Sequence, residues 1–380
     1  MIKTIALVFG GVSVEHEISI LSAMQVLAAM PKQYHVIPIY IAKDGHFYSD
    51  PSFCDVSIFT DLSRVCTTNK EVQLVRIKQQ VYLVHLRKYL YQKKEAIDFV
   101  FPILHGTYGE DGCFQGYLET LHLPYAQGKV LAMAVGQDKQ IMKCLLQDAG
   151  LPVVPWFSYR KGEAMKEAFY QKVNRLGYPI MIKPAHLGSS IGIQIVHYAD
   201  DLKKAMEEAL MYDSCLVIEK KIEQMEEYNI SVLCNEQATT CSVIEKVMRH
   251  GDLLTFEDKY ESRTKTKVAS NAYRTIPAHI SKQQEEEIKE YAIETCLALQ
   301  AEGIVRIDFL YDVKSDTCYV NEINSIPGSM AYYLWEASGV TFTQVLESCI
   351  QMGLNRWKQE QALIHTFDNN VLQHHQGIKK

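Results

Sequence analysis

The sequence lacks the long apolar and basic segments that mark membrane and nucleic-acid proteins. None of its 380 residues falls in an apolar run approaching the roughly 20 positions that span a bilayer. The start, MIKTIALVFGG, lacks the basic flank and cleavage site of a secretory signal. The formal net charge is −6 and there is no long basic block, so nothing predicts attraction to a polyphosphate backbone. We therefore expect a cytoplasmic protein without a membrane or nucleic-acid partner.

Two common chemical signatures are also absent. The ten cysteines are scattered singly, with no CxxC pair and no His/Cys cluster at zinc-ligand spacing, which favours reduced thiols that pack as small hydrophobes. The Walker A pattern GxxxxGK[ST] does not occur. What remains is ordinary globular composition, 47% hydrophobic and 22% charged, in a chain long enough for two or three domains.

The first part of the chain alternates between strand and helix patterns. Apolar runs at residues 4–9 and 35–42 flank a helical pattern at 16–30, and another apolar strand follows at 98–104. This alternation predicts an open parallel, Rossmann-like sheet in an N-terminal domain of residues 1–124.

Two further domains are expected after this boundary. GLPVVPW is a stop signal of glycine and prolines, and the strands and helices around it predict a small α+β domain at residues 125–222. Residues 223–380 form the last predicted domain, in which Ser281 and Gln284 make a capping box at the start of a helix.

The segments GIVRIDFLYD and CYVNEINSIPGS predict a metal site. Alternation along a strand puts Arg306 and Asp308 on one face of the first segment, and Glu322 and Asn324 on one face of the second. Paired as a hairpin, the segments present oxygen ligands that suit magnesium together with substrate phosphates. The alternative is a solvated sheet face that carries charges, but the glycine turn after Asn324 favours a ligand site.

The segment YPIMIKPAHLGSSIGI predicts a phosphate-binding loop. Lys183 ends an apolar strand, and a loop containing Gly188, Ser189, Ser190 and Gly192 follows. Backbone N–H groups of such a loop can surround phosphate oxygens, with the lysine as the counter-charge. A plain turn beside a surface lysine is the alternative.

Three other segments carry candidate residues, each with a structural alternative. In GGVSVEHEIS, Glu15 can meet a ligand ammonium, although Glu15 and Glu17 also suit the first turn of a helix. His105 ends a strand in FPILHGTYGEDGCFQG, where ligands gather, but a lone histidine is more often structural. Lys259 and Tyr260 lie in a long polar stretch that is either a lid or a solvated loop.

In their order along the chain, these segments resemble the D-alanyl-D-alanine ligase family. GGxSxEHExS, LHGxxGEDGxxQG, DK, KPxxxGSSxGI, KY, RxDF and NExNxxPG follow the family's order and approximate spacing from near residue 5 to near residue 335. The resemblance implies an ATP-grasp fold, with ATP clamped between two α+β lobes and the amino acids against the N-terminal domain. It also implies two magnesium (or manganese) ions and a homodimer.

The resemblance assigns the nucleotide site residue by residue. Glu219 in LVIEKKI would meet adenine and Glu227 in MEEYNI the ribose, with Glu226 as a competitor for the second role. The implied ATP-binding set is Lys139, Lys183, Gly188, Ser189, Ser190, Glu219, Lys220, Glu227 and Lys259.

The resemblance also implies a reaction centre beside the nucleotide. Asp308, Glu322 and Asn324 would hold the two metal ions. Arg306 and the N–H of Gly328 would stabilise negative charge on the reacting carboxylate oxygen. The implied reaction transfers a phosphoryl group from ATP to the first D-alanine, whose acyl phosphate is then attacked by the amine of the second. The product would serve peptidoglycan synthesis in the cell wall.

The first D-alanine would be held mainly from the N-terminal domain. Glu15, linked by hydrogen bonds to Ser189 and Tyr260, would bind its ammonium group. The other implied substrate contacts are His105, Arg306, Ser329, Tyr333 and Leu334.

One segment departs from the family pattern. Residues 332–335, YYLW, stand where a small polar residue commonly meets the carboxylate of the second substrate, and Ser329 is the nearest hydroxyl apart from the tyrosines. A ligase that uses D-serine or D-lactate as second substrate is therefore an alternative, although Tyr260 favours an amine nucleophile. A non-catalytic nucleotide-binding protein is a third hypothesis, against which stand the complete sets of phosphate lysines and metal ligands.

Overall fold

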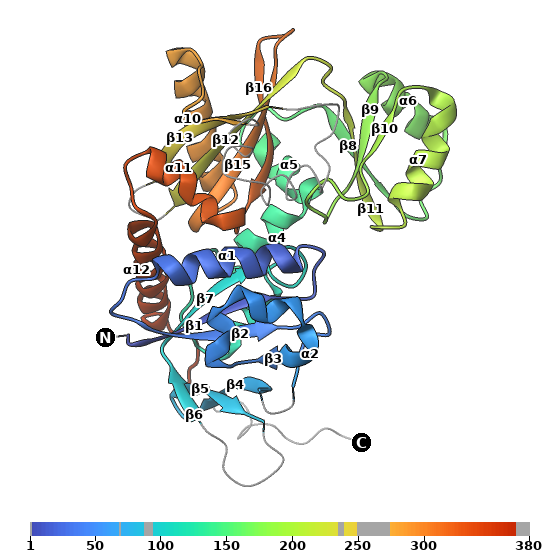
Figure 1. Cartoon of the computed structure of the whole chain (residues 1–380). Coiled ribbons are helices and arrows are strands. Elements are labelled where there is room, and N and C mark those ends of the chain that lie inside the picture. The colour runs from blue at the N-terminus through green and yellow to red at the C-terminus, as the bar shows by residue number, and fades with distance from the viewer. Residues whose placement is uncertain (1, 68–69, 87–93, 235–238, 249–273, 370–380) are drawn as a thin grey trace, which may run out of the picture.

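The structure is a computed structural model that describes residues 2–67, 70–86, 94–234, 239–248 and 274–369. Three sheets of four or five strands form its main bodies, joined by helices (Figure 1). The predicted loop at residues 249–272, with Lys259 and Tyr260, lies outside the described residues. Within the described ranges, no helix combines the length and apolar character needed to cross a membrane.

The first sheet is mostly parallel, as the alternating pattern predicts. Its centre is β1 (Thr4–Gly10), which pairs in parallel with β2 (His35–Ile41) and with β7 (Phe99–Leu104). β3 (Phe47–Tyr48) adds an antiparallel edge. Every residue of β7 is buried, as expected of a strand covered on both faces. In Figure 1, α1 (His16–Ala29) lies above this sheet, on the side where the other two main sheets are drawn.

A small antiparallel sheet in the first 124 residues was not predicted. It has the order β4-β5-β6 and packs apolar side chains such as Leu74 and Leu83 into the same core as Val8 and Val100. Its strands are too short and too mixed in character to stand out from the sequence. The elements are β4 (Val72–Ile77), β5 (Gln80–His85), β6 (Lys94–Ile97), and the short helices η1 (Pro51–Cys54), η2 (Val56–Thr60) and α2 (Leu62–Val65).

The second main sheet is antiparallel, with the order β10-β9-β11-β8. The predicted helix at 163–175 begins later, as α6 at Glu167, after a turn. α6 and α7 contribute Phe169, Val173, Leu202 and Met206 to the core under this sheet. Its strands are β8 (Trp156–Arg160), β9 (Ile180–Pro184), β10 (Gln194–Val196) and β11 (Cys215–Lys220). The helices before and beside it are α3 (Cys113–Thr120), α4 (Val130–Gln137), α5 (Lys139–Asp148), α6 (Glu167–Leu176), η3 (Ala199–Asp201) and α7 (Leu202–Ala209).

The third main sheet contains the predicted hairpin. Its order is β14-β13-β12-β15-β16, and all its pairs are antiparallel. The capping box of Ser281 and Gln284 is present at the start of α10, as predicted. The elements are β12 (Met225–Cys234), β13 (Thr240–Val247), β14 (Arg274–Thr275), α10 (Lys282–Ala298), β15 (Gly303–Asp312) and β16 (Thr317–Asn324).

The end of the described chain returns to its beginning. η6 (Gly328–Ala331), α11 (Tyr332–Ala337) and α12 (Phe342–Gln361) follow β16. Trp335, Leu346 and Ile350 lie in one apolar core with Ile5 and Phe99, and Figure 1 shows α12 running beside the first sheet. The predicted division at residues 124 and 222 stays a prediction, and α12 shares an apolar core with β1 and β7 of the first sheet.

Candidate active site

The face of the β15–β16 hairpin carries the predicted metal ligands. Asp308 lies opposite Glu322, and Arg306 lies opposite Asn324, so all four side chains share one face. Arg306 donates to both carboxylate oxygens of Asp308, at 2.6 and 2.7 Å, and Asn324 Nδ2 donates to Asp308 Oδ2 at 3.1 Å. Burial raises the pKa of Asp308, and the Arg306 guanidinium opposes that rise.

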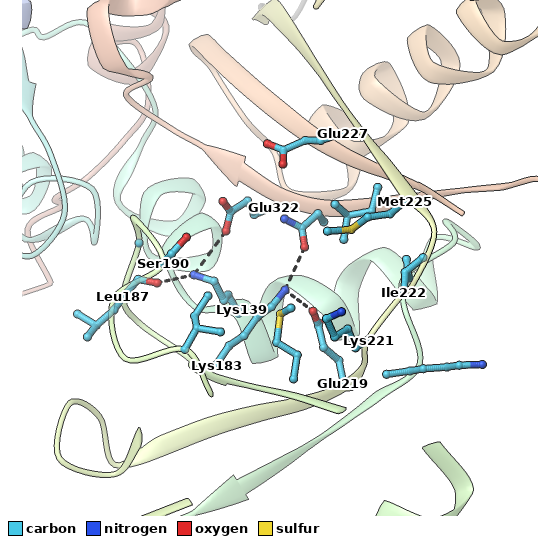
Figure 2. A pocket seen from close by; sticks show the side chains of 16 residues that line it. Lys139, Lys183, Leu187, Ser190, Glu219, Lys221, Ile222, Met225, Glu227 and Glu322 are labelled. Atoms are coloured by element: carbon cyan, nitrogen blue, oxygen red, sulfur yellow. Dashed lines mark hydrogen bonds and ion pairs between the residues drawn. The ribbon is translucent and has the colours of Figure 1, made fainter. Parts of the chain in front are cut away.

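Two of the predicted phosphate lysines point into one pocket between the second and third sheets (Figure 2). Lys183 is placed by β9, and Lys139 by the start of α5. Lys139 Nζ donates to the Leu187 carbonyl at 2.6 Å and lies 3.7 Å from Glu322 Oε2. Lys183 Nζ pairs with Glu219 and donates to Asn321 Oδ1 at 3.3 Å. Each ammonium group is therefore paired with a carboxylate: Lys139 with Glu322 of the third sheet, and Lys183 with Glu219 of the second sheet.

Glu219 is held by a second lysine that sequence reasoning missed. Lys143 lies one turn after Lys139 on α5, is 1% exposed, and has its Nζ 3.1 Å from Glu219 Oε2. Burial lowers the pKa of Lys143 and favours a higher pKa for Glu219, but Lys143 and Lys183 together hold the Glu219 pKa below its ordinary value. The spacing of four residues on a helix was the available signal for this cluster.

The predicted glycine loop has a backbone that can face an anion. Ser189 and Ser190 have left-handed φ values of 53° and 60°. Gly192 has φ 71°, and a Cβ there would meet Pro184 at 2.9 Å, so both conformation and space require glycine. Successive backbone N–H groups in such conformations form concave anion sites. The Ser189 hydroxyl donates to the Glu15 carboxylate, which connects this loop to the N-terminal domain.

The base of the loop is attached to its neighbours by His186. Its Nδ1 lies 2.9 Å from Asp213 Oδ2, and its Nε2 lies 3.3 Å from Asp138 Oδ2. Hydrogen bonds to Asp138 and then Asp213 raise the pKa of His186 to about 10. Since Asp138 also caps the start of α5, this imidazolium links the loop to the helix that carries Lys139.

The far end of the pocket has apolar walls suited to a flat ring. Glu227 lies there, whereas Glu226, on the opposite face of β12, pairs with Lys246 at 2.6 Å and accepts a hydrogen bond from Tyr228. This placement favours Glu227 over Glu226 beside a nucleotide. The pocket lining includes Gly188, Ser190 and Lys220 of the predicted set, and it adds Lys221 and the apolar residues Met181, Ile222, Met225 and Leu310.

Near Arg306, the segment that follows β7 contributes His105 and a carboxylate, Glu110, that the sequence does not predict. His105 is 4% exposed, and its Nε2 lies 3.2 Å from Ser22 Oγ; burial lowers its pKa. Glu110 accepts the N–H of Gly106 at 3.0 Å. Burial, and next the charge of Glu15, raise the pKa of Glu110 to about 8. Glu110 belongs to the segment LHGxxGEDGxxQG, but nothing in the local pattern indicates a role for it.

Of residues 332–335, the segment that departs from the family pattern, two are buried in the core and two are partly exposed. Leu334 is fully buried and Trp335 is 1% exposed, with its indole N–H donating to Ser231 Oγ at 2.9 Å. Leu334 therefore belongs to the core, and its predicted contact with a substrate stays a prediction. The Tyr333 ring is half-buried and lies 4.7 Å from the Arg274 guanidinium carbon. Ser329 contributes its backbone N–H to a hydrogen bond with Ser22.

The donor set of the hairpin face fits magnesium. Across the described ranges, no cluster of three or more His, Cys, Asp and Glu side chains is gathered for a metal. Magnesium commonly uses only one or two carboxylates together with substrate phosphates, which agrees with Asp308, Glu322 and the amide of Asn324 beside the phosphate lysines.

Two antiparallel sheets that face each other across a glycine loop and a pocket lined by Lys139 and Lys183 define the ATP-grasp class of ATP-dependent ligases. The solved structure of the D-alanine-D-alanine ligase from Coxiella burnetii superposes with a TM-score of 0.81 at 27% identity, covering 98% of this chain and 99% of that one. VanG D-Ala:D-Ser ligase from Enterococcus faecalis gives a TM-score of 0.76 at 26% identity, covering 93% of this chain and 100% of that one.

Sequence comparisons name the family within this class. The family model described as D-ala D-ala ligase N-terminus matches residues 4–128, and that described as D-ala D-ala ligase C-terminus matches residues 145–351. The D-alanine--D-alanine ligase of Thermosipho melanesiensis is 39% identical over 369 residues, which cover 97% of this chain and 98% of the relative. That of Geobacillus thermodenitrificans is 35% identical, covering 96% and 99%. The chain belongs to the D-alanine–D-alanine ligase family.

Proposed function

We propose that this chain joins two D-alanine molecules at the expense of ATP, giving D-alanyl-D-alanine, ADP and phosphate for peptidoglycan precursor synthesis. Relatives of nearly the same length, up to 39% identical, carry the name of this activity. The observation that carries the proposal is the Ser189–Glu15 hydrogen bond, since it brings an ammonium-binding carboxylate to the loop that faces the phosphates.

The reaction begins with phosphoryl transfer from ATP to the carboxylate of the first D-alanine. Lys139 and Lys183 neutralise charge on the transferred group, so positioning and electrostatics supply most of the catalysis. Asp308, Glu322 and Asn324 would hold magnesium, which when bound neutralises phosphate charge as a Lewis acid. Phosphate contacts of the lysines would replace their present contacts with Glu219 and Glu322.

The second step is attack of the second D-alanine's amine on the acyl phosphate, with release of phosphate. Glu15 holds the ammonium group of the first D-alanine, and His105 lies near this substrate. Arg306 and the Gly328 N–H stabilise the negative charge that develops on the carbonyl oxygen. Lys259 and Tyr260 belong to this proposal as lid residues that exclude water from the acyl phosphate.

A second candidate activity is ligation of D-alanine to D-serine or D-lactate. The observation behind it is Tyr333, which stands where a small polar residue is common and lies against Arg274. VanG, named a D-Ala:D-Ser ligase, shares the fold but only 26% of the sequence. The higher identity to the curated D-alanine--D-alanine ligases favours the first candidate.

The deciding experiment incubates the purified protein with ATP, magnesium and D-alanine, alone and mixed with D-serine or D-lactate, and identifies products by mass spectrometry. We expect D-alanyl-D-alanine to dominate, with loss of phosphate release in the matched Glu322→Gln variant. A mixed product in preference to it would move the function to the second candidate. No phosphate release with any D-amino acid would overturn both candidates, whereas full activity of Glu322→Gln would overturn the metal-binding role of Glu322.

The proposal includes a homodimer, which family membership supports. Light scattering on the purified protein tests this directly, and a mass of one chain at all concentrations would reject it.

A further inference from the structure

The turn between β16 and α11 has a backbone shape that its own residues disfavour. Ser329, Met330 and Ala331 have consecutive left-handed φ values of 55°, 53° and 46°. Side chains with a Cβ clash in this region, and only glycine adopts it freely. Ordered residues in this conformation persist when surrounding contacts hold them there. The turn is therefore held in place from outside.

One such contact comes from Glu110. Its Oε1 accepts the Ile326 N–H at 2.7 Å, across 216 positions of sequence, while its Oε2 accepts the Gly106 N–H at 3.0 Å. The Glu110 side chain is 12% exposed, and each oxygen serves a different segment. Glu110 thus fixes the beginning of the turn to the loop that follows β7.

A second contact comes from Ser22 on α1. Its Oγ accepts the Ser329 N–H at 3.0 Å, across 307 positions, and lies 3.2 Å from His105 Nε2. His105 Nδ1 in turn lies 4.0 Å from Glu110 Oε2. Glu110, His105 and Ser22 therefore form one line of adjacent side chains, here called the turn clamp, which holds the turn at Ile326 and at Ser329 from the N-terminal side of the chain.

The clamped turn carries the groups that the proposed reaction needs. Asn324 precedes it, and Gly328 lies between the two held N–H groups of Ile326 and Ser329. A Cβ added to Gly328 would meet no described atom within 4 Å, so this part of the backbone borders open space. α4 supports the turn from behind, because a Cβ on Gly136 would lie 2.7 Å from Ser325 Oγ.

We propose that Glu110 and Ser22 are positioning residues for the ligation: they hold the turn so that the Gly328 N–H points at the reacting carboxylate oxygen. This inference rests on the proposed function. Donors aimed at developing charge act only when pre-positioned, so a relaxed turn costs turnover. Neither residue lines the nucleotide pocket, so we expect ATP binding to be unchanged when they are substituted.

The test compares Ser22→Ala and Glu110→Gln with Asp111→Asn. Ser22→Ala removes only one hydroxyl, and Glu110→Gln keeps the volume but presents an N–H₂ group to one of the two N–H donors. Asp111 is the matched control, since its carboxylate accepts the N–H groups of Tyr108 and Cys113 in the same loop and makes no bond to the turn. We expect kcat to fall about 10-fold or more in the first two variants, with the ATP KM unchanged, and no change in the control.

Two further readouts separate positioning from general damage. Because both residues hold one turn, the double variant should lose much less than the product of the two single effects. Hydrogen exchange of the peptide that spans residues 324–331 should quicken in both single variants and not in Asp111→Asn.

An active wild type with unchanged kcat in Ser22→Ala would overturn the positioning role alone. Equal losses in Asp111→Asn, or a raised ATP KM that accounts for the loss, would do the same. Wild-type protein that releases no phosphate with D-alanine would instead overturn the proposed function, and the positioning role with it. The two cases are distinguishable, because the outcomes that reject only the positioning role are seen with an active wild-type protein, whereas rejection of the proposed function requires an inactive one.

Discussion

The Ser189 hydroxyl donates a hydrogen bond to the Glu15 carboxylate, joining residues 174 positions apart. Ser189 belongs to the glycine loop and Glu15 precedes α1, so this bond connects the proposed phosphate and amino-acid sites. A Cβ on Gly188 would come within 3.5 Å of the same carboxylate. Ser189 and Gly188 of the loop thus lie directly against the Glu15 carboxylate of the N-terminal segment.

Glu15→Gln should raise the KM for the first D-alanine by about 10- to 100-fold, because a hydrogen bond to a charged group contributes about 1.5–3 kcal/mol. Initial rates over a D-alanine titration measure this. Glu17→Gln is the matched control, since Glu17 is a neighbouring carboxylate that pairs with Lys43 at the surface. A similar rise in both variants would show that the effect is general to this turn.

Lys143→Met should destabilise the protein by about 1–3 kcal/mol, because it removes one of the two ammonium groups that compensate the buried Glu219 carboxylate and leaves Lys183 as the other. Lys143 is 1% exposed and faces Glu219, which is 2% exposed. Urea unfolding measures the change, with exposed Lys204→Met as control. Equal stability of the two variants would contradict a structural role for the second lysine at Glu219.

His186→Asn should lower stability in a pH-dependent way. Asp138 and Asp213 raise the pKa of His186 in the folded protein to about 10, above the ordinary value of 6.5. The folded state therefore binds the proton more tightly, and the stabilisation is complete below pH 6.5 and disappears as pH approaches 10. Urea midpoints of wild type and variant should differ most near pH 6 and converge at alkaline pH. A constant difference across this range would contradict the charged interaction.

Arg356→Leu should cost about 3–5 kcal/mol of folding stability, since it removes one charge of a largely buried, hydrogen-bonded cluster. Arg356 donates to Glu302 at 2.8 Å and to the Tyr125 carbonyl at 2.9 Å, fastening α12 to the start of β15 and to the segment that follows α3. Thermal unfolding compared with Arg64→Leu, an exposed arginine, measures the loss. An unchanged midpoint would show that the apolar contacts of α12 suffice.

Several parts of the site were predictable because they depend on local pattern. Alternation along two strands placed Arg306, Asp308, Glu322 and Asn324 on one face, and the register of the β15–β16 hairpin confirms it. The cluster of glycine and serine after Lys183 marked a loop that needs left-handed conformations. The roles of Lys259 and Tyr260 stay predictions, since both lie outside the described residues.

Sequence by itself determined which residue types stand on each strand face, where the phosphate-type loop lies and where helices begin, because side-chain alternation and capping are set by neighbours along the chain. Only the tertiary structure decided that Leu334 and Trp335 fill the core and that Lys143 faces Glu219. It also decided that Glu110 and Ser22 hold a turn more than 200 positions away. Such contacts depend on how the first and third sheets pack, which no local pattern encodes.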